Sequence, residues 1–297
     1  MSGLAELSSG KGRGEENFPV ASRLIAPAHR RAVIAFYGVA RMADDIADHP
    51  TATPEEKLAW LAQIEACLEG RDDGVAAAVQ LRRELSVRRL EARHMLDLLK
   101  AFRLDVVKTR YADWSELMDY CRYSAAPVGR FVLDVHGEDS STWPASDALC
   151  SALQVINHLQ DCAKDFRQLD RVYLPADFLC AAGIGDPPLQ SLAQALSAVT
   201  GGETLRRAIH ALCGRVGDLL DEADPLAGQI RDVRLSLEVG IIQALARSLS
   251  RRLARRDPLS QRVHHRRAEF ALIALVGAGS TLAARARRSS LAPRGNS

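Results

Sequence analysis

The stretch LQVINHLQDCAKDFRQLDRVYLP, residues 153–175, places a polar stripe along one face of a helix whose other positions are mostly apolar. The stripe consists of Gln154, Asn157, Asp161 and Asp165, at spacings of three, four and four residues. Side chains three or four residues apart share one face of an α-helix. Because carboxylates and amides beside a protein core are costly to bury without partners, this face is expected to hold something positively charged.

A second acidic helix end occurs earlier, in ARMADDIADHP, residues 40–50. Asp44 and Asp48 are again four residues apart and share one helix face. Arg41 lies four residues before Asp45, so the segment taken alone fits equally well a surface helix end with an Arg41–Asp45 ion pair. The second occurrence of the Asp-x-x-x-Asp spacing favours a function shared by both helices.

Two facing Asp-x-x-x-Asp helices are typical of a site for divalent cations. Mg²⁺ prefers oxygen ligands, commonly binds one or two carboxylates, and completes its shell with water and substrate phosphate. The pattern therefore predicts a magnesium site that binds a diphosphate rather than a neutral ligand.

The composition is that of a soluble globular chain of 297 residues, 47% hydrophobic and 26% charged. The formal net charge of +2 gives no indication of nucleic-acid binding. Basic residues cluster late, in RSLSRRLARR and HHRR, where a solvated helix face is favoured over a membrane or phosphate patch. The six cysteines form no CxxC pair, which argues against zinc and indicates buried thiols in a reducing compartment.

Apolar residues recur every three or four positions, and alternating strand-like runs are nearly absent, so we predict one all-α domain. The predicted helices cover residues 28–48, 54–69, 74–84, 87–103, 113–137, 145–166, 175–182, 189–198, 202–222, 231–255 and 266–285. Breaks fall at Gly, Pro and Asp clusters such as GRDDG and GIGDPP.

We expect a disordered arm over residues 1–16, a domain over residues 17–285, and a disordered tail over residues 286–297. The longest apolar stretch, Phe270–Ala284, is shorter than the roughly 18–20 residues that a membrane-spanning helix needs. We therefore expect it to pack as a core helix.

The motifs together resemble the squalene/phytoene synthase branch of the trans-isoprenyl diphosphate synthases, in which both acidic motifs read DxxxD. YCRYSAAPVGR, residues 120–130, is similar to the branch's YCxxxAxxVG element, and DRVYLP, residues 170–175, to its RxYLP tail. The opening ENFPVASRLIAPAHRRAVIAFYGVARMADDIAD and the segment NHLQDCAKDFRQLDRVYLP are most similar to the hydroxysqualene synthases of bacterial hopanoid biosynthesis. The resemblance covers about residues 16–265, and the motifs are specific only in combination.

This resemblance implies a single-domain isoprenoid synthase type I helical bundle around a central cavity. It implies catalytic roles for Asp44, Asp48, Asp161, Asp165 and Tyr120, and metal ligation by the same four aspartates with Asn157. It implies substrate binding by Arg41, Asp45, Gln154, Asn157, Tyr173, Val128, Gly129 and Arg262. Within that set, Arg41 and Arg262 would contact phosphate, and Val128 and Gly129 would line the reaction chamber with Tyr120.

Three positions depart from the pattern of the branch. Asn17 stands at a usual serine position, Gln160 replaces an arginine, and Leu245 stands near a late tyrosine position. The change at Gln160 removes a positive charge that would help to hold a second diphosphate. The departures therefore fit an enzyme that ionises one preformed intermediate better than one that condenses two substrates.

The activity implied is the Mg²⁺-dependent conversion of presqualene diphosphate to hydroxysqualene, with release of diphosphate and capture of the carbocation by water. About two or three Mg²⁺ ions would accompany the diphosphate, and no NADPH is expected. The alternative within the family is head-to-head condensation of two farnesyl diphosphates to presqualene diphosphate, squalene or a carotenoid precursor. An alternative of another class is a silent helical protein whose aspartates bind a structural cation or cap surface helices.

The expected location is the cytoplasm, with loose association with the inner membrane because substrate and product are lipids. Functional partners would be a presqualene diphosphate synthase and a hydroxysqualene reductase, and no nucleic acid is expected. His158 is expected to be packed or solvated rather than a base, and Cys162 to be part of the core. The break at residues 127–129 is either a simple kink or a place where substrate approaches the backbone, and the second is favoured. Tyr120, Tyr123 and Asn157 are the candidates for holding the reacting water.

Overall fold

The computed structural model describes residues 25–184, 188–198 and 201–291. Its helices are α1 (Pro27–Ala47), α2 (Pro54–Leu68), α3 (Ala76–Arg88), α4 (Arg93–Val107), α5 (Trp114–Ser124), α6 (Ala126–Val135), the short 3₁₀ turn η2 (Ser140–Thr142), α7 (Trp143–Leu169), α8 (Ala176–Ala181), α9 (Pro188–Ser197), α10 (Glu203–Ala223), α11 (Leu226–Gln229), α12 (Val233–Leu253) and α13 (Arg267–Leu291). The described residues contain no strand, and one isolated bridge joins Arg110 to Val172. The predicted all-α fold is confirmed. The predicted arm over residues 1–16, and Asn17, lie outside the described residues.

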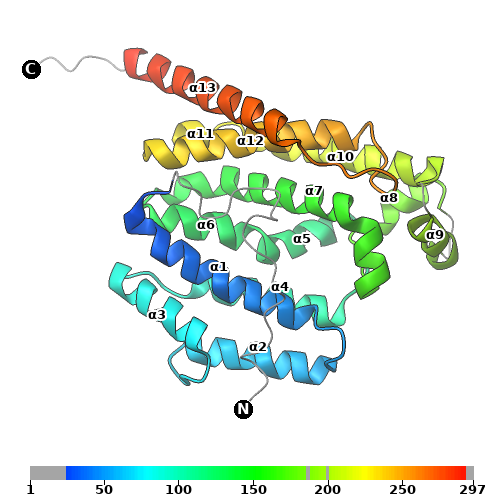
Figure 1. Ribbon diagram of the computed structural model, residues 1–297, viewed down its shortest axis with the longest axis horizontal. Helices are drawn as coiled ribbons and strands as arrows, with labels where there is room; N and C mark the ends of the chain where they lie inside the picture. Colours follow the sequence, from blue (N-terminus) through cyan, green and yellow to red (C-terminus); the bar gives the residue numbers. More distant parts are fainter. Residues whose placement is uncertain (1–24, 185–187, 199–200, 292–297) are drawn as a thin grey trace, which may run out of the picture.

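The helices form successive layers, with α2 and α3 at one edge and α13 at the other (Figure 1). One hydrophobic core lies among α1–α4 and α6, and a second joins α4, α5 and α7 to α8–α12. The central helix α7 packs against α6 on one side and α10 on the other. The two cores meet at α4 and α6, which contribute residues to both, and α7, the helix that carries the polar stripe, belongs to the second core.

Helix α7 begins at Trp143 with a proline in its first turn, where a missing backbone N–H costs nothing. It ends at Leu169, and the following Asp170 has a left-handed backbone (φ 50°) that stops the helix. The Arg171 N–H bonds back to the Asp165 carbonyl at 3.2 Å, and the Val172 N–H donates to the Thr109 carbonyl at 2.9 Å. This turn directs the RVYLP segment back across the end of the helix.

The single helix predicted over residues 113–137 is wrong, because the chain breaks at Ala125 into α5 and α6. Pro127 explains the break, since it has no backbone N–H to continue a helix and fits only a first turn. Ala125 departs from helical geometry with φ −124° and ψ −50°. Similarly, the predicted boundary between residues 84 and 87 is misplaced, because α3 continues to Arg88.

The prediction that Phe270–Ala284 packs as a core helix is also wrong. Helix α13 lies on the surface of α12, and the side chains of Leu272, Leu275 and Val276 are more than half exposed. Only 11% of its most apolar window is buried, and by length and composition the segment Arg267–Arg287 could cross a membrane. The helix continues to Leu291, past residue 285 where we expected it to end.

The cysteine prediction holds for most but not all thiols. Cys67, Cys121, Cys162 and Cys213 are buried and free, as expected. Cys180 is exposed, which contradicts the prediction, because the short helix α8 presents it to solvent.

Candidate active site

A cavity of about 850 Å³ lies between α1, α4, α5, α6 and α7, and is closed on one side by the connection from α12 to α13. Most of the predicted site residues line it: Arg41, Asp44, Asp48, Tyr120, Val128, Gln154, Asn157, Asp161, Asp165, Tyr173 and Arg262. The aspartates from α1 and from α7 therefore open onto the same space. Asp45 and Gly129 were predicted to bind substrate, but neither lines this cavity.

The charged and aromatic side chains occupy differently exposed parts of the cavity. The side chains of Asp44, Asp48 and Asp161 are 40%, 37% and 48% exposed. Tyr120 and Tyr173 are only 4% and 7% exposed. The carboxylates therefore lie at the open, solvent-facing end of the cavity, and the tyrosines lie at its buried end.

Arg41 joins two of the acidic residues on α1. Its guanidinium donates to Asp44 at 2.9 Å and to Asp45 at 2.8 Å. The ion pair Arg41–Asp45 that the spacing predicted is present, and Asp45 itself does not line the cavity. Asp45 thus orients Arg41, which does line the cavity.

The two aspartate pairs influence each other across the cavity. Partial desolvation by the surrounding cavity wall and the neighbouring Asp48 carboxylate raise the pKa of Asp44 to about 7. Burial, Asp161 and again Asp48 raise the pKa of Asp165 to about 7. Asp48 therefore repels both Asp44 on its own helix and Asp165 on α7. A cation between the two helices would relieve this repulsion.

The donor set at this end of the cavity fits Mg²⁺. Its ligands are hard carboxylate and amide oxygens from two helices, which is the ligand type that Mg²⁺ prefers. Among the described residues, no three His, Cys, Asp or Glu side chains come together as a metal-binding group. An ion bound by one or two of these aspartates would take most of its ligands from water and substrate oxygens, which is also typical of Mg²⁺.

Arg171, which the sequence analysis did not single out, connects the two acidic helices. Its side chain is 8% exposed and donates to the Asp48 carboxylate at 2.6 Å. A second donor contacts the Ala47 carbonyl at 3.1 Å, at the end of α1. The signal was present in the DRVYLP segment, where a basic residue directly follows the end of an acidic helix.

Asp105 on α4 was also missed, and it organises the buried end of the cavity. It accepts hydrogen bonds from the Tyr120 hydroxyl at 2.9 Å and from the Tyr173 hydroxyl at 2.8 Å. Burial raises the pKa of Asp105 to about 6, although Arg171 and the two hydroxyl groups oppose this shift. The carboxylate thus fixes the orientation of both tyrosine rings.

His158 is packed, as predicted, and it also lines the cavity. Its ring stacks on Tyr173 with centroids 3.6 Å apart, and its Nε2 lies 3.1 Å from the Gln154 amide nitrogen. Burial and the positive charge of Arg171 lower the pKa of His158 to about 3. The imidazole is therefore neutral and adds no positive charge to the cavity.

Val128 and Gly129, which were predicted to line the cavity together, have different surroundings in the structure. Val128 lines the cavity, as expected. Gly129 instead faces α7, where an added Cβ would lie 2.4 Å from the Ser146 hydroxyl and 2.6 Å from the Cys150 sulfur. The glycine allows close packing of α6 on α7, which corrects its predicted role in the chamber wall.

The connection after α12 forms the remaining wall of the cavity, from Pro258 to His264. The Gln160 amide donates to the Val263 carbonyl, which ties this connection to α7. Gln160, at the position that the sequence analysis compared with an arginine, therefore has a structural contact with this loop. Arg262 from the same connection lines the cavity, as predicted.

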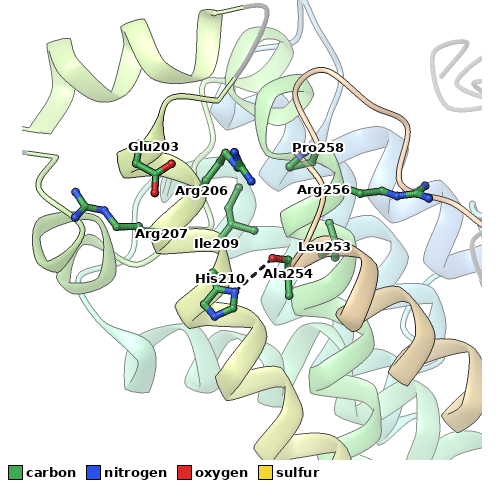
Figure 2. A pocket seen from close by; sticks show the side chains of 9 residues that line it. All are labelled: Glu203, Arg206, Arg207, Ile209, His210, Leu253, Ala254, Arg256 and Pro258. Atoms are coloured by element: carbon green, nitrogen blue, oxygen red, sulfur yellow. Dashed lines mark hydrogen bonds between the residues drawn. The ribbon is translucent and has the colours of Figure 1, made fainter.

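A second, smaller hollow of about 310 Å³ lies between α10 and the end of α12 (Figure 2). Arg206 points into it, whereas Arg207 and Arg256 point away on opposite sides. Arg207 donates to the Ala182 carbonyl at 2.7 Å. None of the predicted site residues lines this hollow, and its cations do not converge on one point.

An all-α fold with two acidic helices facing one cavity defines the isoprenoid synthase class of helical proteins. Residues 12–269 match the squalene/phytoene synthase family, and the chain belongs to that family.

Relatives of known function resemble the chain over nearly its full length. It is 52% identical to hydroxysqualene synthase of Rhodopseudomonas palustris, covering 95% of this chain and 94% of the relative. It is 51% identical to hydroxysqualene synthase of Sinorhizobium fredii, covering 91% of this chain and 90% of the relative. Similarity at this level supports an enzyme of the same type.

Solved structures show the same fold. The squalene synthase from Alicyclobacillus acidocaldarius superimposes with a TM-score of 0.67 at 26% identity, covering 92% of each chain. A dehydrosqualene synthase in complex with a ligand gives a TM-score of 0.78 at 16% identity, covering 94% of this chain and 96% of that one.

Proposed function

We propose that this chain converts presqualene diphosphate to hydroxysqualene and diphosphate, using water as the second substrate. One observation carries the proposal: aspartate pairs from α1 and α7 line the exposed end of a cavity whose other end is lined by buried tyrosines. Presqualene diphosphate is a long hydrocarbon that carries a diphosphate, so the substrate is also charged at one end and apolar at the other. The similarity to two hydroxysqualene synthases supports this choice of substrate.

The diphosphate would lie at the acidic end of the cavity, held by ions and by arginines. Mg²⁺ held by Asp44, Asp48, Asp161 and Asp165, with Asn157, would neutralise the leaving group as a Lewis acid. Arg41 and Arg262 would donate charge-assisted hydrogen bonds to the same oxygens.

The chemical steps begin with cleavage of the carbon–oxygen bond to the diphosphate, whose electron pair leaves with the diphosphate. The cyclopropylcarbinyl cation then rearranges in the part of the cavity lined by Tyr120, Tyr173 and His158. Those rings are buried and carry no formal charge, so they exclude bulk water and do not repel the cation. A water molecule adds to the cation, its oxygen forming the new carbon–oxygen bond, and a proton is released.

Two features bear on how the water is held. Gln154 and His158 are polar side chains at the buried end, joined by a 3.1 Å contact. The Tyr120 hydroxyl donates to Asp105, so it is already oriented. Of the earlier candidates, Tyr120 and Asn157 line the cavity, whereas Tyr123 does not.

Head-to-head condensation of two farnesyl diphosphates is the second candidate function. It is favoured by the chain's 33% identity to phytoene synthase 2 of Solanum lycopersicum, although that match covers only 58% of each chain. It is disfavoured by Gln160, because its amide holds a loop and contributes no positive charge for a second diphosphate.

In a pathway, the substrate would come from a presqualene diphosphate synthase and the product would pass to a hydroxysqualene reductase. Both compounds are lipids, so the proposed location is the cytoplasm with loose association with the inner membrane. No NADPH takes part in the proposed reaction, because the cation is captured by water.

The test is incubation of the purified protein with presqualene diphosphate and Mg²⁺, without NADPH, in water enriched in ¹⁸O. The expected product is a triterpene alcohol that carries the heavy oxygen, detected by mass spectrometry, and chelation of Mg²⁺ should abolish its formation. A parallel incubation uses farnesyl diphosphate alone. Consumption of farnesyl diphosphate with accumulation of presqualene diphosphate would favour the second candidate, and no turnover of either substrate would contradict both.

A further inference from the structure

Helix α13 presents an apolar stripe that the rest of the chain does not cover. Its large exposed side chains are Leu272, Leu275, Val276 and Leu282, with exposed fractions of 64%, 72%, 62% and 50%. Ala268, Gly279 and Ala283 continue the same side of the helix at helical spacing and are also exposed. We call these seven residues the outer stripe of α13. Of the eight large hydrophobic side chains that stand exposed among the described residues, four belong to it.

The opposite side of α13 is firmly packed against α12. Added Cβ atoms at the crossing would lie 1.9 Å from the Thr281 hydroxyl, for Gly240, and 2.8 Å from the Gly240 carbonyl, for Gly277. Near its end, Arg285 donates to the Ile230 carbonyl at 2.7 Å and to the Arg231 carbonyl at 3.0 Å. A membrane-crossing position would break these contacts, so α13 is built to lie along a surface with only its outer stripe inserted.

The charged residues at the two ends of α13 favour one kind of partner for the outer stripe. Exposed arginines stand at both ends of the helix, Arg266 and Arg267 at the start and Arg287 near the end. The one acidic residue between 267 and 287 is Glu269, and it pairs with Arg252 at 3.1 Å. A second copy of this face would set arginine against arginine in either orientation. A bilayer with anionic headgroups instead matches an apolar stripe between cationic ends.

The chain connection places this surface next to the candidate active site. Residues 258–264 line the cavity, and α13 begins at Arg267, three residues after them. Figure 1 shows α13 along one outer edge of the molecule, with α2 and α3 at the opposite edge. A bilayer that held α13 would therefore be joined through one short segment to the cavity wall.

We infer that the outer stripe of α13 is a docking surface for anionic phospholipid bilayers, on which the helix lies flat in the interface. This inference deepens the loose membrane association proposed above by assigning its surface and lipid class, but it does not depend on the identity of the reaction.

The test is co-sedimentation of the full chain with vesicles of phosphatidylcholine containing about a third phosphatidylglycerol, with pure phosphatidylcholine vesicles in parallel. The wild-type chain is expected to bind the anionic vesicles, and to bind the neutral ones more weakly. The double variant Leu275→Glu/Val276→Glu should lose at least about tenfold in partitioning, because it removes apolar contact and adds two repelled charges.

The matched control is Val87→Glu/Val107→Glu, which adds the same charges at valines that are 81% and 65% exposed on α3 and α4. It should bind vesicles as the wild type does. Circular dichroism and sedimentation of all variants check that the fold is kept and whether the chain self-associates.

Equal binding by both double variants would overturn the inference, as would the absence of vesicle binding by the wild type. A dimer of the wild type that Leu275→Glu/Val276→Glu dissociates, without vesicle binding, would show that a second copy covers the stripe. Turnover of dispersed substrate in detergent is expected to be unchanged in both variants. Failure of the docking surface is therefore distinguishable from failure of the proposed reaction.

Discussion

The guanidinium of Arg171 lies 2.6 Å from the Asp48 carboxylate and so joins the segment after α7 to the end of α1. Both elements contribute aspartates to the cavity, and the contact fixes their relative position. The positive charge also acts on the buried carboxylate of Asp105, whose pKa it lowers against the effect of burial. One arginine thus serves two carboxylates that belong to different helices.

We expect Arg171→Gln to lower the free energy of unfolding by about 2–3 kcal/mol at pH 7. The reason is that the buried carboxylate of Asp105 would lose the positive charge that offsets its burial. The double variant Arg171→Gln/Asp105→Asn should lose less free energy of unfolding than the sum of the losses in the two single variants. Urea denaturation of the four proteins measures this coupling.

The control for that cycle is Arg110→Gln, which breaks the exposed ion pair between Arg110 and Asp170. Exposed pairs contribute little, so its cost should stay below about 1 kcal/mol. If the losses in free energy of unfolding caused by Arg171→Gln and Asp105→Asn simply add in the double variant, the arginine does not compensate the buried carboxylate.

The stability of the fold should depend on pH through Asp105. Its pKa is about 6 in the folded chain against an ordinary value of 3.8, so the folded state binds this proton more tightly. Between those values the folded state carries more protons than the unfolded state, and stability falls as pH rises. A shift of this size corresponds to about 3 kcal/mol, lost between roughly pH 4 and pH 6 and constant above.

Asp105→Asn has no proton to lose at that position. The difference between the wild-type and variant stabilities, measured by denaturation from pH 4 to pH 7, should therefore change in favour of the variant as pH rises. Other carboxylates titrate in both proteins and cancel in the difference. A difference that does not vary with pH would mean that Asp105 is not held in this environment.

Asp161→Asn should reduce turnover of presqualene diphosphate by about a hundredfold or more, because it removes a proposed ligand of the metal–diphosphate group. A second readout does not require turnover. Mg²⁺ with inorganic pyrophosphate should raise the melting temperature of the wild type and raise that of the variant much less. Asp119→Asn, on an exposed i,i+3 pair with Arg122, is the matched control and should behave as the wild type. An unchanged pyrophosphate response in Asp161→Asn would remove this residue from the site.

Gly129→Ala should destabilise the fold by about 1–2 kcal/mol, because the new methyl group would force the Ser146 and Cys150 side chains away from α6. Gly214→Ala, on α10, is the comparison, since nothing lies within 4 Å of its added Cβ. That change should be neutral or stabilising by up to about 1 kcal/mol. Thermal denaturation separates the two, and a harmless Gly129→Ala would mean that α6 and α7 are not closely packed there.

Much of the architecture could be predicted from the sequence because helical periodicity and the Asp-x-x-x-Asp spacing are local patterns. Gln154, Asn157, Asp161 and Asp165 needed only one straight helix to share a face, and α7 provides it. That α1 and α7 face each other was a hypothesis from the repeated spacing, whereas the expectation of a cavity between them came from the family resemblance.

Asp105 could not be identified from its local sequence, FRLDVV, in which it is the one acidic residue among mostly apolar neighbours. Its hydrogen-bond partners, Tyr120 and Tyr173, come from 15 and 68 residues away. The prediction for α13 was wrong for a related reason. An apolar run has the same composition in a core helix and on a surface, and only the number of neighbours available to cover it decides which it becomes.

The uninterrupted length of α7 has a consequence for selectivity among hydrocarbon substrates. Gln154 and Asp165 lie on one rigid rod of 27 residues, which keeps them about 16 Å apart along its axis. In the proposed reaction, this helix would set the distance between the diphosphate, near Asp165, and the rearranging hydrocarbon, near Gln154. An enzyme of this fold that accepts a longer or shorter hydrocarbon would therefore need changes in the cavity wall outside α7, around Leu98, Phe102 and Val128.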